Sequence, residues 1–312
     1  MISLPDFNPN HPSLIKPFTE NNLITTSRFE MGSTLKIFNA AMAYENNSVD
    51  ENELFDVSNN YQLTKKHIIK DDFPSKNPIN FDTIFTKSSN IGSIQILEKV
   101  GIEKQKNFLE NLGLKKNVRI KGLFTIQNSY PKNWNNEISK SISFGYGISL
   151  TPISLTKLFS SLVNGGFEVH PTLIFRANKI KRKRVIDEMT SKKINELLNK
   201  IVLEGTGKKA KVNSLSVGGK TGTAKKIFDG NYDDQKLVTS FIGTFPIEKP
   251  KYLLFVIFDE PKKENKKNDY YGGNTAAPVF SNIVSQIAPI LQIKPKREKN
   301  IENVVFKQTV DN

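Results

Sequence analysis

Three extended, apolar runs follow one another in the last third of the chain, and they constrain the fold more than any other feature. They span residues 215–224, 237–245 and 252–261. Because only short links separate them, we expect antiparallel pairing within one sheet. The most apolar stretch, residues 252–258, is far shorter than the roughly 20 residues of a membrane-spanning helix, and its length suits a buried strand.

The middle of the chain is predicted to be mostly helical. Capping residues, a 3.6-residue apolar rhythm and terminal glycines predict helices over residues 88–101, 103–114, 149–166, 191–205 and 276–291. A further helix is expected to begin near Ser33, whereas residues 166–175 and 179–186 look extended. Helices in the middle followed by strands near the end indicate an α+β fold.

Composition excludes several kinds of site. The net charge of +14 comes from lysines scattered among asparagines and isoleucines, so we interpret it as a solvated lysine-rich surface. We therefore expect no nucleic-acid partner. An anionic polymer stays open as a partner. The absence of cysteine excludes disulfides and thiolate zinc sites. His11, His67 and His170 lack the spacing of metal ligands, and no metal site is predicted.

Ser-x-x-Lys tetrads begin at several serines, among them Ser13, Ser33 and Ser154, and only Ser33 follows a glycine at a predicted helix start. Residues i and i+3 share a helix face, so the Lys36 amine can reach the Ser33 hydroxyl. A helix amino terminus adds unpaired N–H donors and a positive field. Ser33 is therefore the candidate nucleophile.

A serine hydroxyl needs a base, and a lysine can serve only if burial or another cation lowers its pKa from about 10.4. The second cation is available in "GGKTGTA", where Lys220 and Thr221 precede a glycine that lets a ligand approach the strand backbone. A phosphate-binding loop is excluded, since the first glycine of G-x-x-x-x-G-K-[ST] would fall at Ser214.

A Ser-Ser-Asn triplet, Ser88 to Asn90, opens the predicted helix at 88–101, where either side chain could simply cap the helix. The shorter Ser-x-Asn pattern recurs at residues 58–60 and 75–77. Taken alone, the triplet at residues 88–90 is explained better by helix capping than by catalysis. The combination reverses that judgement, because Ser-x-x-Lys, Ser-x-Asn and Lys-Thr-Gly in this order are the signature of penicillin-binding proteins and serine β-lactamases.

Longer stretches carry a more specific resemblance. "SLPDFNPN", "SFGYGISLTPISLTKLFSSLVNGG", "GTGKKAKVNSLSVGGKTGTAKK" and "YYGGNTAAPVF" resemble the transpeptidase domain of class B penicillin-binding proteins. Gly145-Tyr146-Gly147 is similar to the septal members of that class. The resemblance implies a penicillin-binding protein/serine β-lactamase-like α+β fold, an antiparallel sheet flanked by helices, over residues 1–292, followed by a disordered tail over 293–312.

The resemblance implies acyl transfer on peptidoglycan. The Ser33 hydroxyl would attack the penultimate D-alanine carbonyl of a stem pentapeptide, expel the terminal D-alanine and form an ester, which an amino group of a neighbouring stem peptide then takes. It also implies inhibition by penicillin and other β-lactams, no cofactor, and partnership with the septal glycosyltransferase FtsW and other division proteins. The catalytic domain would lie in the periplasm of an enzyme anchored in the inner membrane.

By the same resemblance each motif residue has a role. Lys36 would be the general base, Ser88 would relay protons, and Asn90 would orient the substrate amide and Lys36. Lys220 would supply the second positive charge.

The resemblance also implies a binding role for the triplet Thr221, Gly222 and Thr223, which would hold the terminal carboxylate of the substrate. The backbone N–H groups of Ser33 and Thr223 would form the oxyanion hole. This assignment agrees with the physical need for fixed donors where negative charge develops.

Three alternatives and two departures remain. A serine β-lactamase would need a residue that activates water, and Glu196 with Asn199 is the candidate match. Helix packing explains that pair better. A D,D-carboxypeptidase and a catalytically impaired division scaffold also stay open as alternatives. Met31 stands where the family commonly has proline. Only thirty-two residues precede Ser33, so we expect a fragment or a misplaced start that lacks the N-terminal strand or strands of the family sheet.

Overall fold

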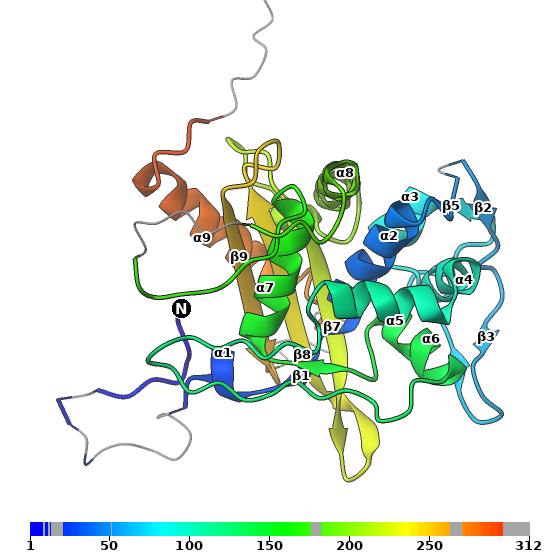
Figure 1. Cartoon of the computed structure of the whole chain (residues 1–312), viewed down its shortest axis with the longest axis horizontal. Helices are drawn as coiled ribbons and strands as arrows, with labels where there is room; N and C mark the ends of the chain where they lie inside the picture. The colour runs from blue at the N-terminus through cyan, green and yellow to red at the C-terminus, as the bar shows by residue number, and fades with distance from the viewer. Residues whose placement is uncertain are drawn as a thin grey trace, which may run out of the picture.

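The computed structural model describes residues 1–8, 10–11, 13, 21–50, 52–175, 182–262 and 270–295. Helices cover both faces of an antiparallel sheet, which confirms the predicted α+β class (Figure 1). The elements before the sheet are α1 (Leu23–Thr26), β1 (Phe29–Glu30), η2 (Gly32–Leu35), α2 (Lys36–Glu45), β2 (Leu54–Phe55), β3 (Tyr61–Gln62), β4 (Ile68–Ile69), β5 (Ile79–Asn80), α3 (Phe81–Thr86), α4 (Asn90–Val100), α5 (Ile102–Asn111), α6 (Asn136–Phe144), β6 (Ser149–Leu150), α7 (Pro152–Val163), α8 (Glu188–Glu204) and η3 (Lys208–Ala210).

The main sheet has the order β7-β8-β9, with β7 at Gly218–Phe228, β8 at Asn231–Phe245 and β9 at Tyr252–Asp259. Both pairings are antiparallel, as the short links predicted, and Lys220 lies opposite Ile242. Helix α9 (Ala276–Ile290) packs on one face, while α7 and α8 lie on the other (Figure 1). The strand that carries Lys220 is therefore an edge strand beside the helical part of the molecule.

Strand β9 forms the opposite edge of this sheet. No strand among the described residues pairs with its outer side. Residues 253–258 are half-buried, so the prediction of a fully buried strand at 252–258 was wrong: an edge strand keeps one side of its backbone and side chains partly open to water. The expectation that further family strands are missing stays a prediction.

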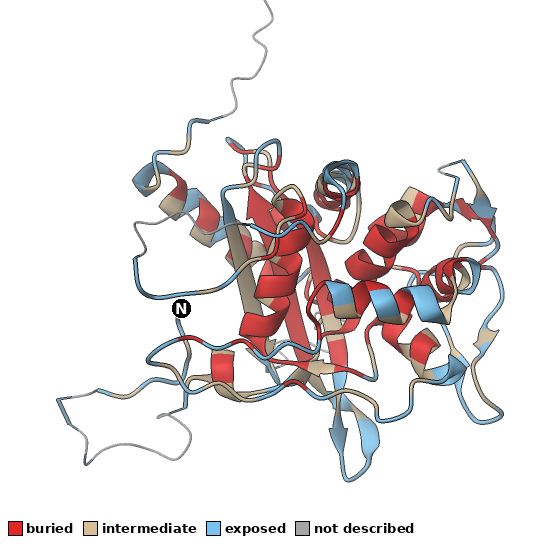
Figure 2. Ribbon diagram, viewed as in Figure 1, coloured by how far each residue is buried: buried red, intermediate tan, exposed pale blue. Residues whose placement is uncertain are grey.

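Helix α2 forms the centre of the larger hydrophobic core. Residues 36–43 are all buried, including the first residue, Lys36. Such a helix is covered on every side, which is typical of a core helix rather than a surface one. Figure 2 shows that buried residues fill α7 and much of β7 and β8, whereas the β7–β8 hairpin projects as an exposed end. The predicted helix start near Ser33 is confirmed.

A second apolar cluster joins the sheet to α9. Phe280 of α9 packs against Phe241 and Phe245 of β8, with ring centroids 4.8 and 6.2 Å apart, respectively. All three rings are at most 1% exposed. Full burial of aromatic side chains at these distances holds the helix against the strand that pairs with β7.

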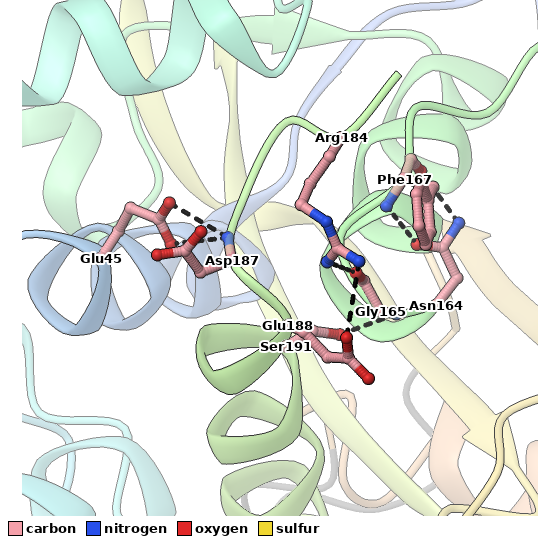
Figure 3. A network of polar contacts seen from close by, with 8 residues as sticks. All are labelled: Glu45, Asn164, Gly165, Phe167, Arg184, Asp187, Glu188 and Ser191. Carbon is pink, nitrogen blue, oxygen red and sulfur yellow. Dashed lines mark hydrogen bonds and ion pairs between the residues drawn. The ribbon is translucent and has the colours of Figure 1, made fainter. Parts of the chain in front are cut away.

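A polar network fixes the start of α8 against α2 and α7 (Figure 3). Both carboxylate oxygens of Glu45, at the end of α2, accept from the Asp187 backbone N–H at 3.1 Å. The Arg184 guanidinium donates to the Gly165 carbonyl after α7 and pairs with Glu188 at 3.5 Å. These contacts satisfy backbone groups at helix ends that would otherwise have no partner.

Local sequence patterns predicted the positions of most of the helices. The five predicted helices correspond to α4, α5, α7, α8 and α9, with ends that differ by a few residues. The two runs expected to be extended form only the bridge between Phe167 and Arg184 among the described residues, and residues 179–181 lie outside them. The expected tail over 293–312 also falls mostly outside, from residue 296 onward, while Ile293 packs against the α9 cluster.

Candidate active site

Ser33 lies directly against strand β7. The preceding Gly32 has φ +53°, and a Cβ there would lie 2.4 Å from the Thr223 carbonyl oxygen, so both the backbone conformation and the space require glycine. Ser33 follows as the second residue of η2 and is half-buried. The structure thus brings the first motif against the Lys-Thr-Gly strand, 190 residues away in sequence.

The Lys36 side chain points to the Ser-x-Asn motif. Its Nζ is fully buried and donates to Asn90 Oδ1 at 2.7 Å, to Ser88 Oγ at 3.3 Å and to the Ser88 carbonyl oxygen. Within the described part of the chain it forms no hydrogen bond with the Ser33 hydroxyl, the contact that the i, i+3 spacing suggested. Lys36 is therefore held by the second motif rather than by the first.

Lys220 approaches the same point from the sheet. Its side chain is 0% exposed, and its Nζ donates to Ser88 Oγ at 2.9 Å and to Thr221 Oγ1 at 3.3 Å. The Ser88 hydroxyl is thus the shared neighbour of two buried lysine amines. All three motifs meet here, although they come from η2 and α2, from the turn before α4, and from β7.

Burial makes the charged form of both amines costly. It lowers the pKa of Lys36 to about 8, against the opposing attraction of Asp71 and Asp72. Burial first, and repulsion from Lys36 second, hold the pKa of Lys220 well below its usual range. A neutral amine is therefore available at a pH where a free lysine is charged, which is the requirement for a base that takes a proton from serine.

Thr221, Gly222 and Thr223 follow Lys220 along β7. Thr221 Oγ1 lies 2.8 Å from Thr206 Oγ1, and Thr223 Oγ1 accepts from the Gly272 N–H at 3.0 Å. A Cβ at Gly222 would meet the Ser240 hydroxyl at 2.4 Å, so the strand packs closely here. Hydroxyls beside a buried amine are suited to binding a carboxylate.

Sequence reasoning missed the segment that supports the Ser-x-Asn motif. Asn90 Nδ2 donates to the Lys70 carbonyl at 2.8 Å, and Asp71 contacts the start of α4. These residues lie in a polar stretch with no periodicity, so no local signal could have identified them.

A second missed group surrounds Glu30, three residues before Ser33. Its Oε1 accepts from the Gly147 N–H at 2.6 Å and from the Tyr232 hydroxyl at 3.2 Å. Tyr146 packs edge-on to Tyr232, with ring centroids 5.2 Å apart. Burial raises the pKa of Glu30. The Gly-Tyr-Gly sequence was the only signal for this group.

The rival motifs have structural explanations. The Ser154 hydroxyl accepts from Thr151 Oγ1 at 2.7 Å, inside the first turn of α7. Burial lowers the pKa of Lys157, but its amine lies 3.8 Å from Glu168, a carboxylate that opposes this shift. Glu196 is exposed on α8. Lys16, the partner expected for Ser13, lies outside the described residues.

Two negative findings concern the described ranges only. They contain no cluster of three or more histidine, aspartate or glutamate side chains arranged to hold a metal ion. None of their helices combines the length and apolar character that crossing a lipid bilayer requires.

Comparison with known proteins gives consistent matches. A family model described as the penicillin binding protein transpeptidase domain matches residues 1–285. A probable peptidoglycan D,D-transpeptidase FtsI of Caulobacter vibrioides is 33% identical over 311 residues, covering 96% of this chain and 52% of the relative. Stage V sporulation protein D of Bacillus subtilis is 31% identical over 320 residues, covering 96% and 48%. The chain thus spans about half the length of these curated relatives.

A solved structure supports the same relationship. The transpeptidase domain of Burkholderia pseudomallei penicillin-binding protein 3, in its apo form, has a TM-score of 0.80 and 28% sequence identity. The alignment covers 89% of this chain and 84% of that one.

Proposed function

The chain belongs to the penicillin-binding protein transpeptidase family, and from that premise we propose that it is a serine D,D-transpeptidase that crosslinks peptidoglycan stem peptides. The observation that carries the proposal is the Ser88 hydroxyl, which two buried lysine amines share; one of the two, Lys36, follows Ser33 by three residues. That arrangement supplies a nucleophile, a base of lowered pKa and a proton relay without a metal or an organic cofactor.

In the first step the Ser33 oxygen forms a bond to the penultimate D-alanine carbonyl carbon, and its proton passes to the neutral Lys36 amine. The peptide bond to the terminal D-alanine breaks, and the departing amine takes a proton relayed through Ser88. The peptide is left as an ester on Ser33. The lowered pKa of Lys36 supports this order of events, because a lysine with an ordinary pKa would hold its proton at neutral pH.

In the second step an amino group from a neighbouring stem peptide attacks the ester carbonyl. Its proton passes to the amine that served as base, the new peptide bond forms, and the Ser33 oxygen leaves with a proton returned to it. Atoms and charge balance over the cycle: one peptide bond is exchanged for another and free D-alanine is released. Asn90 orients the Lys36 amine through the hydrogen bond at 2.7 Å.

Substrate binding is assigned to β7. Lys220 and the hydroxyls of Thr221 and Thr223 would hold the terminal carboxylate, with Gly222 allowing close approach of the strand. The backbone N–H groups of Ser33 and Thr223 would stabilise the oxyanion. The close packing of Gly32 on Thr223 supports this pairing of donors, because it places both segments at one wall.

A fluorescent penicillin tests the proposal. We expect a stable covalent adduct on Ser33, no adduct for Ser33→Ala, and normal labelling for Ser154→Ala, a matched control that removes the serine of another Ser-x-x-Lys tetrad. Rapid loss of the adduct would favour a serine β-lactamase, and release of D-alanine without crosslinking would favour a D,D-carboxypeptidase. A folded chain that forms no adduct would favour a division scaffold.

The cellular role is also a proposal. The FtsI name of one relative supports septal cell-wall synthesis during cell division, with the septal glycosyltransferase FtsW and other division proteins as partners. In that role the catalytic domain works in the periplasm of an enzyme anchored in the inner membrane. Co-purification of the protein with FtsW from cross-linked membranes would test this, with Ser33→Ala as a variant expected to bind equally well.

A further inference from the structure

Asp71 caps helix α4 from a distance of 19 residues in sequence. Its Oδ1 accepts from the Asn90 N–H at 2.6 Å and from the Ile91 N–H at 3.0 Å, and its Oδ2 accepts from the Ser89 hydroxyl at 2.5 Å. Ser89 in turn accepts from the Gly92 N–H at 2.8 Å. The first three N–H donors of the helix are therefore all satisfied, and a negative charge lies at its positive end.

The residue before this cap is strained. Ser88 has φ +61°, a left-handed conformation that residues other than glycine adopt at an energetic cost. Such a conformation persists only where the surroundings hold it. The strain directs the Ser88 hydroxyl toward Lys36 and Lys220, while the next residues are fixed by Asp71.

We propose that Asp71 is a positioning residue: its carboxylate fixes the turn that aims the Ser88 hydroxyl at the two buried amines. The inference rests on the proposed transpeptidase function. Asp71 touches neither Ser33 nor the amines through a hydrogen bond, so it acts through the Ser-x-Asn motif. Without its carboxylate the turn can relax, and the relay hydroxyl leaves its place.

The same carboxylate also has an electrostatic effect. The charged or titratable groups that act on Lys36 are Asp71 and Asp72 from the loop and Lys220 from β7. Asp71 raises the pKa of Lys36 against the effect of burial. Its removal therefore has two separable results, a slower reaction once Lys36 is neutral and a lower pKa for Lys36 itself.

The test measures the rate constant for labelling of the full chain by a fluorescent penicillin, from about pH 6 to about pH 10, around the pKa values involved. For Asp71→Asn we expect the high-pH plateau to fall by about 10- to 100-fold, the size of effect that a small misplacement of a catalytic group produces. The rising limb of the plot of labelling rate against pH should move to lower pH, because the Lys36 pKa falls when the Asp71 charge is removed. A purely structural role would lower the amount of active protein without moving the limb.

Asp56→Asn is the matched control. Asp56 is exposed in the same stretch between α2 and α3, and its Oδ1 accepts from the Ser58 N–H at 2.9 Å. The same substitution therefore removes the charge of a carboxylate that also accepts from a backbone N–H, but away from the site. Labelling should be unchanged. A wild-type plateau and limb in Asp71→Asn would overturn the inference.

Two further measurements keep the inference separate from the proposed function. If the wild-type chain is not labelled at all, the proposed function fails, and the inference is judged by hydrogen exchange of the Asn90 and Ile91 amides, which should speed up in Asp71→Asn and not in Asp56→Asn. If Asp71→Asn does not fold, Asp71→Glu replaces it, and failure of both to fold would overturn the positioning role in favour of a structural one.

Discussion

Lys36 of α2 and Lys220 of β7 donate to a single acceptor, the hydroxyl of Ser88, and neither side chain is exposed to water. Two positive charges that share one acceptor away from water repel each other, so holding both amines protonated costs free energy. Burial lowers the pKa of Lys36 to about 8, and burial together with repulsion from Lys36 holds the pKa of Lys220 well below its usual range. Because Lys36 is the amine proposed to accept the Ser33 proton, we expect its titration to control the reaction.

The pH profile of acylation follows from the titration of Lys36. The Lys36 amine must be neutral to accept the Ser33 proton, so the labelling rate should rise with pH and level off above the Lys36 pKa of about 8. The measurement is the penicillin labelling rate as a function of pH, corrected for intrinsic hydrolysis of the probe. A rising limb near the ordinary lysine value of about 10.4 would contradict the assignment of Lys36 as base.

The buried amine should also destabilise the fold. Below pH 8 the folded chain keeps Lys36 protonated at a cost, because its folded pKa of about 8 lies below the unfolded value. Between pH 8 and the unfolded value the unfolded chain binds more protons than the folded one, so wild-type stability rises with pH in that window. Lys36→Met should therefore raise the free energy of unfolding by about 1–2 kcal/mol at pH 7.

Urea unfolding of the two proteins at several pH values measures this effect. The advantage of Lys36→Met should shrink as pH increases through that window, because the wild-type chain then loses its penalty. An advantage that is independent of pH would mean that packing, and not the buried charge, is responsible.

The sequence predicted the elements that rest on local chemistry. Helix α7 begins at Thr151 and Pro152, a cap and a first-turn proline that were readable directly, and the Lys220 strand was recognisable from its apolar run. The three motifs indicated Ser33 and its neighbours as candidate site residues. Each of these signals depends on residues within a few positions of one another.

What the sequence could not provide are contacts between distant segments. Asp71 reaches α4 from a stretch without periodicity, and Glu30 meets Tyr232 across 202 positions. The half-buried state of β9 depends on what pairs with its outer side, and no property of the strand itself reports that. The direction of the Lys36 amine, toward Ser88 rather than Ser33, likewise depends on packing.

Gly32 should tolerate no side chain. Gly32→Ala would place a Cβ 2.4 Å from the Thr223 carbonyl and force alanine to φ +53°. We expect a loss of at least about 1–3 kcal/mol in the free energy of unfolding, together with loss of penicillin labelling, because the Ser33 turn must move away from β7. Thermal unfolding and labelling of the folded fraction measure the two effects.

Gly122→Ala is the control for that substitution. Gly122 also has a positive φ, +86°, but nothing lies within 4 Å of its added Cβ. It should show the backbone penalty alone and keep normal labelling. Equal losses in both variants would mean that the close approach to Thr223 is unimportant.

Asn90→Asp should move the acylation profile in the direction opposite to Asp71→Asn. Asn90 Oδ1 accepts from Lys36 at 2.7 Å, so a carboxylate there would favour the protonated amine and raise the Lys36 pKa above about 8. The new side chain also loses the donor to the Lys70 carbonyl. Labelling at pH 7 should fall, by about tenfold for each pKa unit gained, and should recover partly at higher pH. A lower rate at every pH with an unmoved limb would show that the Asn90 oxygen does not act on Lys36.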